Sequence, residues 1–64
     1  MSATSAELSS IAATVEDLNG RLGAIASVYD AAHRDDLVGE LHEVERSLRA
    51  ALRRLQRLAA TDGA

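Results

Sequence analysis

The first half of the chain carries a regular pattern of apolar residues. They recur at alternating spacings of three and four, which places them on one face of an α-helix. The positions are Leu8, Ile11, Val15, Leu18, Leu22, Ile25, Tyr29 and Ala32. We therefore expect a long first helix over residues 5–33, with residues 1–4 frayed.

A second apolar pattern begins after the polar run at residues 33–36. Continuing the first frame would place Asp36, Gly39 and Glu43 on the apolar face, so the frame breaks there, and Asp35 or Asp36 can cap a new helix. The new frame contains Leu37, Leu41, Val44, Leu48, Ala51, Leu55 and Leu58, and it is widened by Val38, Leu52 and Ala59. These positions predict a turn at about residues 33–36, a second helix over residues 36–60 and a frayed end at residues 61–64.

Two long helices joined by a short turn predict an all-α fold, an antiparallel helical hairpin that forms a single domain over residues 1–64. Burial at about 25 cal/mol per Å² would not offset about 1.5 kcal/mol per ordered residue in a lone hairpin, and the absence of cysteine excludes disulfides. We therefore expect a homodimer that forms a four-helix bundle or coiled coil, with its parallel or antiparallel sense, or a higher oligomer, left open. The expected core and oligomer interface contains Leu8, Ile11, Val15, Leu18, Leu22, Ile25, Tyr29, Leu37, Leu41, Val44, Leu48, Leu52, Leu55 and Leu58.

Small residues line the opposite face of the first helix. Such a face lets another backbone come close, so it is a candidate contact for a second protein. Its main positions are Ala13, Gly20, Ala24, Ser27 and Ala31. Interior glycines cost about 1 kcal/mol each, but the apolar pattern passes Gly20 and Gly23 without changing phase. One continuous helix is expected, and a kink at Gly20 is the alternative.

The chain has 64 residues and a net charge of -3, which is too mild to indicate a nucleic-acid-binding or disordered acidic protein. All its basic residues are Arg, a bias that indicates a GC-rich coding genome, and we expect a bacterial source. The charges are unevenly distributed, with an acidic middle and a basic end. Arg53, Arg54 and Arg57 lack an acid three or four residues away. They can form a solvated face, a contact with the acidic middle of a second subunit, or a site for an anion such as RNA, DNA or a nucleotide.

A family resemblance adds one more candidate anion for the basic end of the chain. Glu43 and Ser47 have the spacing of the start of a motif in small helical-hairpin anti-sigma proteins that clasp a cyclic dinucleotide. The resemblance implies a cyclic dinucleotide as a candidate ligand. Ala50, however, stands where that motif has Arg.

The sequence predicts no catalytic residue, cofactor or metal site. Asp30, His33, His42 and Glu45 are ligand types found in metal sites of helical bundles. Pairing the helices about a turn near residue 34, however, places Asp30 opposite Gly39 and His42 opposite Ser27. We therefore expect these groups not to converge.

The expected function is that of a non-enzymatic helical protein–protein interaction module, a small regulatory or adaptor protein that acts as a homo-oligomer. The alternative is an anion-binding regulator that uses the Arg-rich end of the second helix. No apolar run approaches the ~18 residues of a membrane span, and the N-terminus lacks the pattern of a signal peptide. A cytoplasmic protein without a membrane partner is therefore expected.

Overall fold

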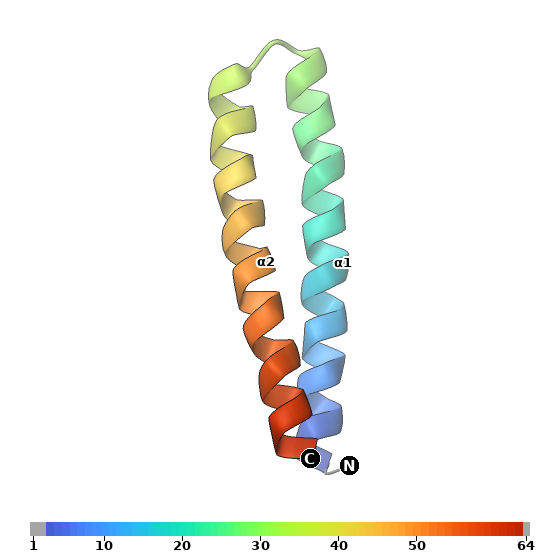
Figure 1. Ribbon diagram of the computed structural model, residues 1–64. Helices are drawn as coiled ribbons and strands as arrows, with labels where there is room; N and C mark the ends of the chain where they lie inside the picture. Colours follow the sequence, from blue (N-terminus) through green and yellow to red (C-terminus); the bar gives the residue numbers. More distant parts are fainter. Residues whose placement is uncertain (1–2, 64) are drawn as a thin grey trace.

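The computed structural model describes residues 3–63, which form two long α-helices joined by a short turn. The helix α1 spans Ala3–Ala31 and α2 spans Asp35–Gly63. The helices lie side by side and antiparallel, with the turn at one end and the two ends of the chain at the other (Figure 1). The Cα atoms extend over 47 × 14 × 9 Å. The predicted all-α helical hairpin is confirmed.

The helices differ from their expected bounds mainly at their ends. α1 begins and ends two residues earlier than the predicted 5–33, and it runs through Gly20 and Gly23 without a break. Residues 3, 4 and 61–63, which were predicted to be frayed, are helical, whereas residues 1, 2 and 64 lie outside the described part of the chain. A Cβ atom added at Gly20 or Gly23 would meet nothing within 4 Å, so no close neighbour requires a glycine there.

The turn begins with backbone hydrogen bonds that close the end of α1. The N–H of Arg34 donates to the carbonyl of Tyr29 at 2.9 Å, and the N–H of His33 donates to the carbonyl of Asp30 at 3.0 Å. These two bonds form the Schellman motif, which requires one residue in the left-handed conformation. His33 is that residue, with a φ of 58°. Glycine is usual at this position because it has no Cβ atom to meet the backbone.

Arg34 connects the turn to the start of α2. Its carbonyl accepts hydrogen bonds from the N–H groups of Leu37 and Val38, both at 3.0 Å. Its guanidinium donates two hydrogen bonds to the carboxylate of Asp36, at 3.3 and 3.2 Å. This contact with Arg34, assisted by the backbone N–H groups of Leu37 and Asp36, lowers the pKa of the exposed Asp36 carboxyl. The turn itself is therefore stabilised by short-range backbone hydrogen bonds and by the contact between Arg34 and Asp36.

The interface between α1 and α2 has small residues at its most buried positions. Ser5, Ala12, Ala26 and Ala59 are at most 7% exposed, and no large side chain among the described residues is fully buried. The hydroxyl of Ser5 donates a hydrogen bond of 2.9 Å to the carbonyl of Ala59. This α1–α2 interface consists of Ser5, Leu8, Ala12, Val15, Asn19, Leu22, Ala26 and Tyr29 on α1, and of Val38, Leu41, Glu45, Leu48, Leu52, Leu55 and Ala59 on α2.

Two polar residues interrupt the middle of this interface. In the register set by Ser5 and Ala59, Asn19 lies across from Glu45, and both are half-buried. Asn19 Oδ1 and Glu45 Oε1 are buried and accept no hydrogen bond within the described residues. The other carboxylate oxygen of Glu45 lies 3.9 Å from Nη1 of Arg49. Polar groups buried in this way weaken an interface, because their lost hydration is only partly replaced.

The left-handed residue in the turn generates a first prediction. His33→Gly should stabilise the protein by about 1 kcal/mol, because glycine adopts a positive φ without the steric cost that a Cβ atom brings. Urea unfolding at one fixed protein concentration measures the change. Ala32→Gly is the matched control one residue earlier, where φ is negative, and it should not stabilise. An unchanged or lower midpoint for His33→Gly would show that the turn is not strained.

Candidate interaction surfaces

A row of large apolar residues on α1 lies outside the α1–α2 interface. Ile11, Leu18 and Ile25 are 42–43% exposed, although they belong to the same apolar pattern as the half-buried Leu8, Val15 and Leu22. The reason is the rotation of α1. Small residues at positions 5, 12 and 26 face α2, so the apolar row on the other side of Leu8, Val15 and Leu22 faces away from it.

Helix α2 leaves a matching row outside the interface. Val44 is 45% exposed and Leu58 53% exposed, and the half-buried Leu37 continues the row toward the turn. Each of these residues comes one position before an interface residue in the sequence. The same is true of each residue in the exposed row of α1. In two antiparallel helices, equivalent flanks of the interface lie on the same side of the pair. The two exposed rows therefore form one surface, which we call the apolar face: Ile11, Leu18, Ile25, Leu37, Val44 and Leu58.

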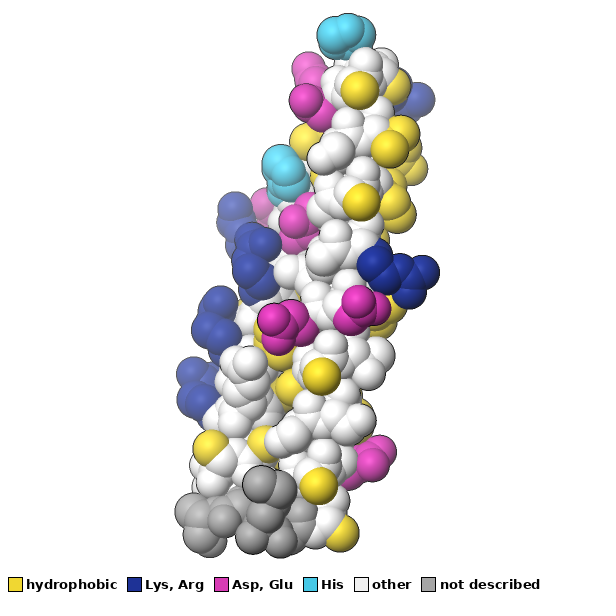
Figure 2. Space-filling model, turned by 90° about the vertical axis from the view of Figure 1, so that its right-hand side faces the viewer, with side chains coloured by type: hydrophobic (Ala, Val, Ile, Leu, Met, Phe, Trp, Pro, Cys, Tyr) yellow, Lys and Arg dark blue, Asp and Glu magenta, His cyan; other side chains and the backbone are white. Residues whose placement is uncertain are grey.

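The apolar face and most of the arginines occupy different sides of the hairpin. Figure 2, in which α1 faces the viewer, shows hydrophobic side chains along the upper right-hand edge and a column of Arg or Lys side chains along the left-hand edge. The chain has no Lys, so this column consists of arginines. The hairpin therefore has an apolar side and a polar side that are separated by the two helices.

The small-residue face of α1 points away from α2. Ala13, Gly20, Ala24, Ser27 and Ala31 are all exposed. The hydroxyl of Ser27 donates to the carbonyl of Gly23 at 3.3 Å, within the same helix. Ala13, Ser27 and Ala31 border the two cavities between α1 and α2. The face stays a candidate contact for a second protein.

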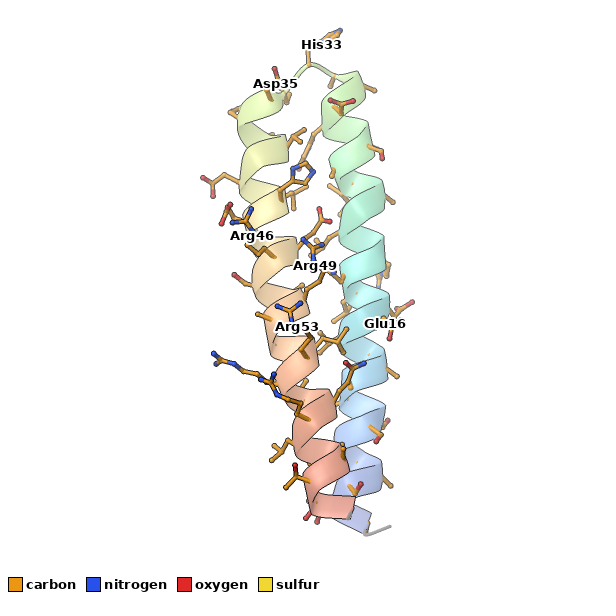
Figure 3. All side chains as sticks on the ribbon, in the orientation of Figure 1. Glu16, His33, Asp35, Arg46, Arg49 and Arg53 are labelled. Atoms are coloured by element: carbon orange, nitrogen blue, oxygen red, sulfur yellow. The ribbon has the colours of Figure 1, made fainter. Side chains whose placement is uncertain are left out.

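The three arginines predicted as one site do not share one side of α2. Arg54 borders a shallow cavity of about 440 Å³ with Ala51, Leu55 and Leu58, next to the apolar face. Arg53 follows Arg49 by one turn, and both extend in front of α2 in Figure 3, whereas Arg46 extends away from α1. A successive pair such as Arg53 and Arg54 is separated by about 100° around a helix. The structure thus divides the basic end into two parts.

Ion pairs on α2 neutralise some of its arginines. Nη1 of Arg46 lies 3.7 Å from the carboxylate of Glu43, and that of Arg49 lies 3.9 Å from Glu45. Within residues 3–63 no ion pair is recorded for Arg53, Arg54 or Arg57. These three side chains, like the exposed Arg21 on α1, are therefore open to contact by a partner.

Two wide cavities open on the polar side of the hairpin. One, of about 500 Å³, lies near the chain ends between Ser9, Glu16 and Gln56. The other, of about 450 Å³, is lined in part by Asp30, His42 and Glu45. The helix pairing predicted about residue 34 would have placed Ser5 opposite residue 64, whereas Ser5 lies opposite Ala59, a shift of register that places His42 opposite Leu22 rather than the predicted Ser27. Among the described residues, however, no group of three or more His, Cys, Asp or Glu could hold a metal ion.

Neither described helix combines the length and the hydropathy that a membrane-spanning helix needs. No protein-family model, curated protein or solved structure matches the chain. Its function therefore has to be argued from its own surfaces.

Sequence reasoning did not single out the residues that decide which way α1 faces. Ser5, Ala12 and Ala26 form a small row at helical spacing beside the apolar row, and Asn19 belongs to it. The row is visible in the sequence as residues seven apart, but the large residues beside it give the stronger signal. Glu45 was considered as a metal ligand, and the structure places it in the α1–α2 interface instead.

The basic end generates a second prediction. Arg53→Glu combined with Arg57→Glu should change the free energy of unfolding by less than about 1 kcal/mol, because both side chains are exposed and their cost is mainly a helix-dipole penalty. Arg49→Glu is the control, and it should cost more because it places a second carboxylate beside Glu45. Circular dichroism during urea unfolding compares the two. A greater loss in the double variant would reveal an interaction of Arg53 or Arg57 that the hairpin does not contain.

Proposed function

We propose that this protein is a non-enzymatic helical protein–protein interaction module that acts as a homo-oligomer in a regulatory or adaptor role. The observation that carries the proposal is the apolar face, where large side chains stay exposed while alanine and serine fill the most buried positions. Extended apolar surfaces of this kind mark interaction sites in soluble proteins. Cytoplasmic location and bacterial source stay predictions from the sequence.

The small core of the hairpin supports association. Each fully buried Leu, Ile or Val contributes about 1.5–3 kcal/mol, but here the large side chains are only partly buried. A chain this short rarely reaches sufficient stability from one core without a disulfide, a metal or a partner. The chain contains no cysteine, so burial of the apolar face against a partner is the most direct source of the missing stability.

The size of the apolar side fits a partner of the same kind. Its outline, 47 × 14 Å between Cα atoms, is close to the ~800 Å² per partner of a standard interface once side chains are included. A second hairpin offers a matching surface of the same length. Two such pairs of helices would form a four-helix bundle with the exposed leucine, isoleucine and valine side chains in its core.

The form of the surfaces supports a binding role rather than a catalytic one. Active sites are typically concave, with convergent polar groups and perturbed pKa values. The apolar face is extended along both helices, and the cavities on the polar side are wide open. The titratable group with a clearly shifted pKa, Asp36, is exposed in the turn and acts there as a partner of Arg34.

An anion-binding regulator that uses Arg53, Arg54 and Arg57 is the second candidate. It is favoured by the absence of recorded ion pairs for these side chains within residues 3–63. Their division between two sides of α2 weakens it for a compact ligand such as a cyclic dinucleotide. Binding of RNA, DNA or a cyclic dinucleotide that falls steeply with salt and is lost when all three become Glu would support this candidate.

The proposed assembly generates a third prediction. Ile25→Asp places a charge in the apolar face and should weaken self-association by roughly 100-fold or more, because the carboxylate would be buried on assembly. Ala24→Asp is the matched control, since it adds the same charge one residue earlier on the exposed small-residue face and should leave association nearly unchanged. Sedimentation equilibrium measures both.

The opposite result would change which face is proposed as the contact between subunits. If Ala24→Asp disrupts self-association and Ile25→Asp does not, the small-residue face is the contact between subunits. If the wild-type protein is a folded monomer at concentrations of about 10 μM and above, the proposed homo-oligomer is wrong.

A further inference from the structure

We propose that two hairpins associate through their apolar faces with their turns at opposite ends, so that α1 packs on α1 and α2 on α2 of the second copy. This inference rests on the proposed function, because it presupposes that the apolar face is covered by a second copy. It adds the sense and the register of the assembly. The argument comes from the charges that the hairpin places along its length and beside the apolar face.

The acidic charge of the hairpin is concentrated at its turn end. The half that contains the turn, residues 18–46, carries the acids Asp30, Asp35, Asp36, Glu40, Glu43 and Glu45 against Arg21, Arg34 and Arg46. The half that contains the chain ends carries Glu7, Glu16, Asp17 and Asp62 against Arg49, Arg53, Arg54 and Arg57. The net charge of -3 therefore belongs to the turn half, and the other half is balanced.

This distribution distinguishes the two ways in which a two-fold axis can pair the faces. With both turns at one end, the two acidic halves would lie together and repel each other. With the turns at opposite ends, each acidic half lies along a balanced half, and the acidic start of α2 runs beside the basic end of α2 of the second copy. Charge complementarity of this kind selects the orientation of a complex more than it sets its affinity.

The border of the apolar face supplies a specific pair of charges. Glu40 follows Leu37 by three residues and precedes Val44 by four, so it lies next to both on the helix surface. Arg54 follows Ala51 by three and precedes Leu58 by four, and it lies in a cavity wall with both. The two charges thus occupy equivalent places at the same edge of α2.

The register that pairs these charges also aligns the apolar residues of α2. An axis that crosses α2 at residues 47 and 48 places Glu40 beside Arg54 of the partner subunit. The same axis places Leu37 near Leu58 of the partner subunit and Val44 near Ala51 of the partner subunit. A surface that matches itself in this way is what a two-fold interface requires.

The rim charges alone do not exclude the opposite orientation. With both turns at one end, α1 would face α2 of the second copy, and Arg54 would lie near Glu7 of the partner subunit. The orientation is therefore decided by the charge distribution along the whole hairpin. Because exposed charges are screened beyond about 10 Å at 0.1 M salt, the preference should be strongest at low ionic strength.

A distance measurement between two spin labels tests the orientation. The chain has no natural cysteine, so Ala31→Cys provides one attachment site, exposed at the turn end of α1. With the turns at opposite ends, the two labels of a dimer are about 28 residues apart along the axis, or roughly 40–50 Å at 1.5 Å per residue. With both turns at one end, they would lie within roughly 30 Å, since neighbouring helices are about 8–10 Å apart.

The three outcomes of a double electron–electron resonance experiment are distinct. A main distance of about 40–50 Å supports the inference. A main distance below about 30 Å overturns the inference and leaves the proposed homo-oligomer intact. An absence of dipolar modulation in protein that circular dichroism shows to be helical overturns both, because no pair of labels has formed.

A charge exchange tests the register. Arg54→Glu should weaken the dimer by roughly tenfold, since it turns two attractive pairs into repulsive ones. Adding Glu40→Arg restores the pairing in reversed form, and most of the affinity should return. Adding Glu7→Arg instead is the matched control and should not restore it. Recovery with Glu7→Arg and not with Glu40→Arg would overturn the inference.

Discussion

The structure depends on how closely α1 and α2 approach each other. Ser5, Ala12, Ala26 and Ala59 are the most buried residues, and the hydroxyl of Ser5 reaches the backbone of Ala59. Small side chains at these positions bring the helices together, but they bury little apolar area per residue. The large apolar side chains are consequently half-buried or exposed, and the free energy that their burial would supply is not available to the hairpin alone. This constraint is the basis of the proposed association.

Much of the fold could be predicted from the sequence. The break in the apolar pattern after Ala32 located the turn, and the unbroken phase through Leu18, Leu22 and Ile25 predicted a helix that continues past Gly20. Both predictions depend on local periodicity, which a single chain displays directly. The left-handed conformation of His33 was not expected, because glycine is the usual signal for it. No side chain near the turn indicates that His33 takes the place of the usual glycine.

The rotation of each helix about its own axis was harder to predict from the sequence. A residue such as Leu22 belongs to the apolar pattern whichever neighbouring row faces α2, so the pattern alone leaves two rotations open. The choice is made by packing between residues far apart in sequence, where Ala12 and Ala26 permit a closer approach than Ile11 and Ile25 would. For the same reason, the sequence grouped Arg53, Arg54 and Arg57 as one patch, although Arg54 lies beside the apolar face and Arg53 does not. Asn19 lies in the interface because it belongs to the row of small residues, and Glu45 of α2 lies across from it.

The central claim is that the hairpin is completed by burying its apolar face against another copy. The most direct measurement is the thermal midpoint of the wild-type protein over a range of concentrations. For a folded dimer that dissociates into unfolded chains, an unfolding enthalpy of about 0.7 kcal/mol per residue corresponds to a rise of roughly 5 °C for each tenfold increase in concentration. We expect such a rise for the wild-type protein. A midpoint that stays constant over a hundredfold range of concentration would contradict it, because the hairpin would then be stable as a single chain.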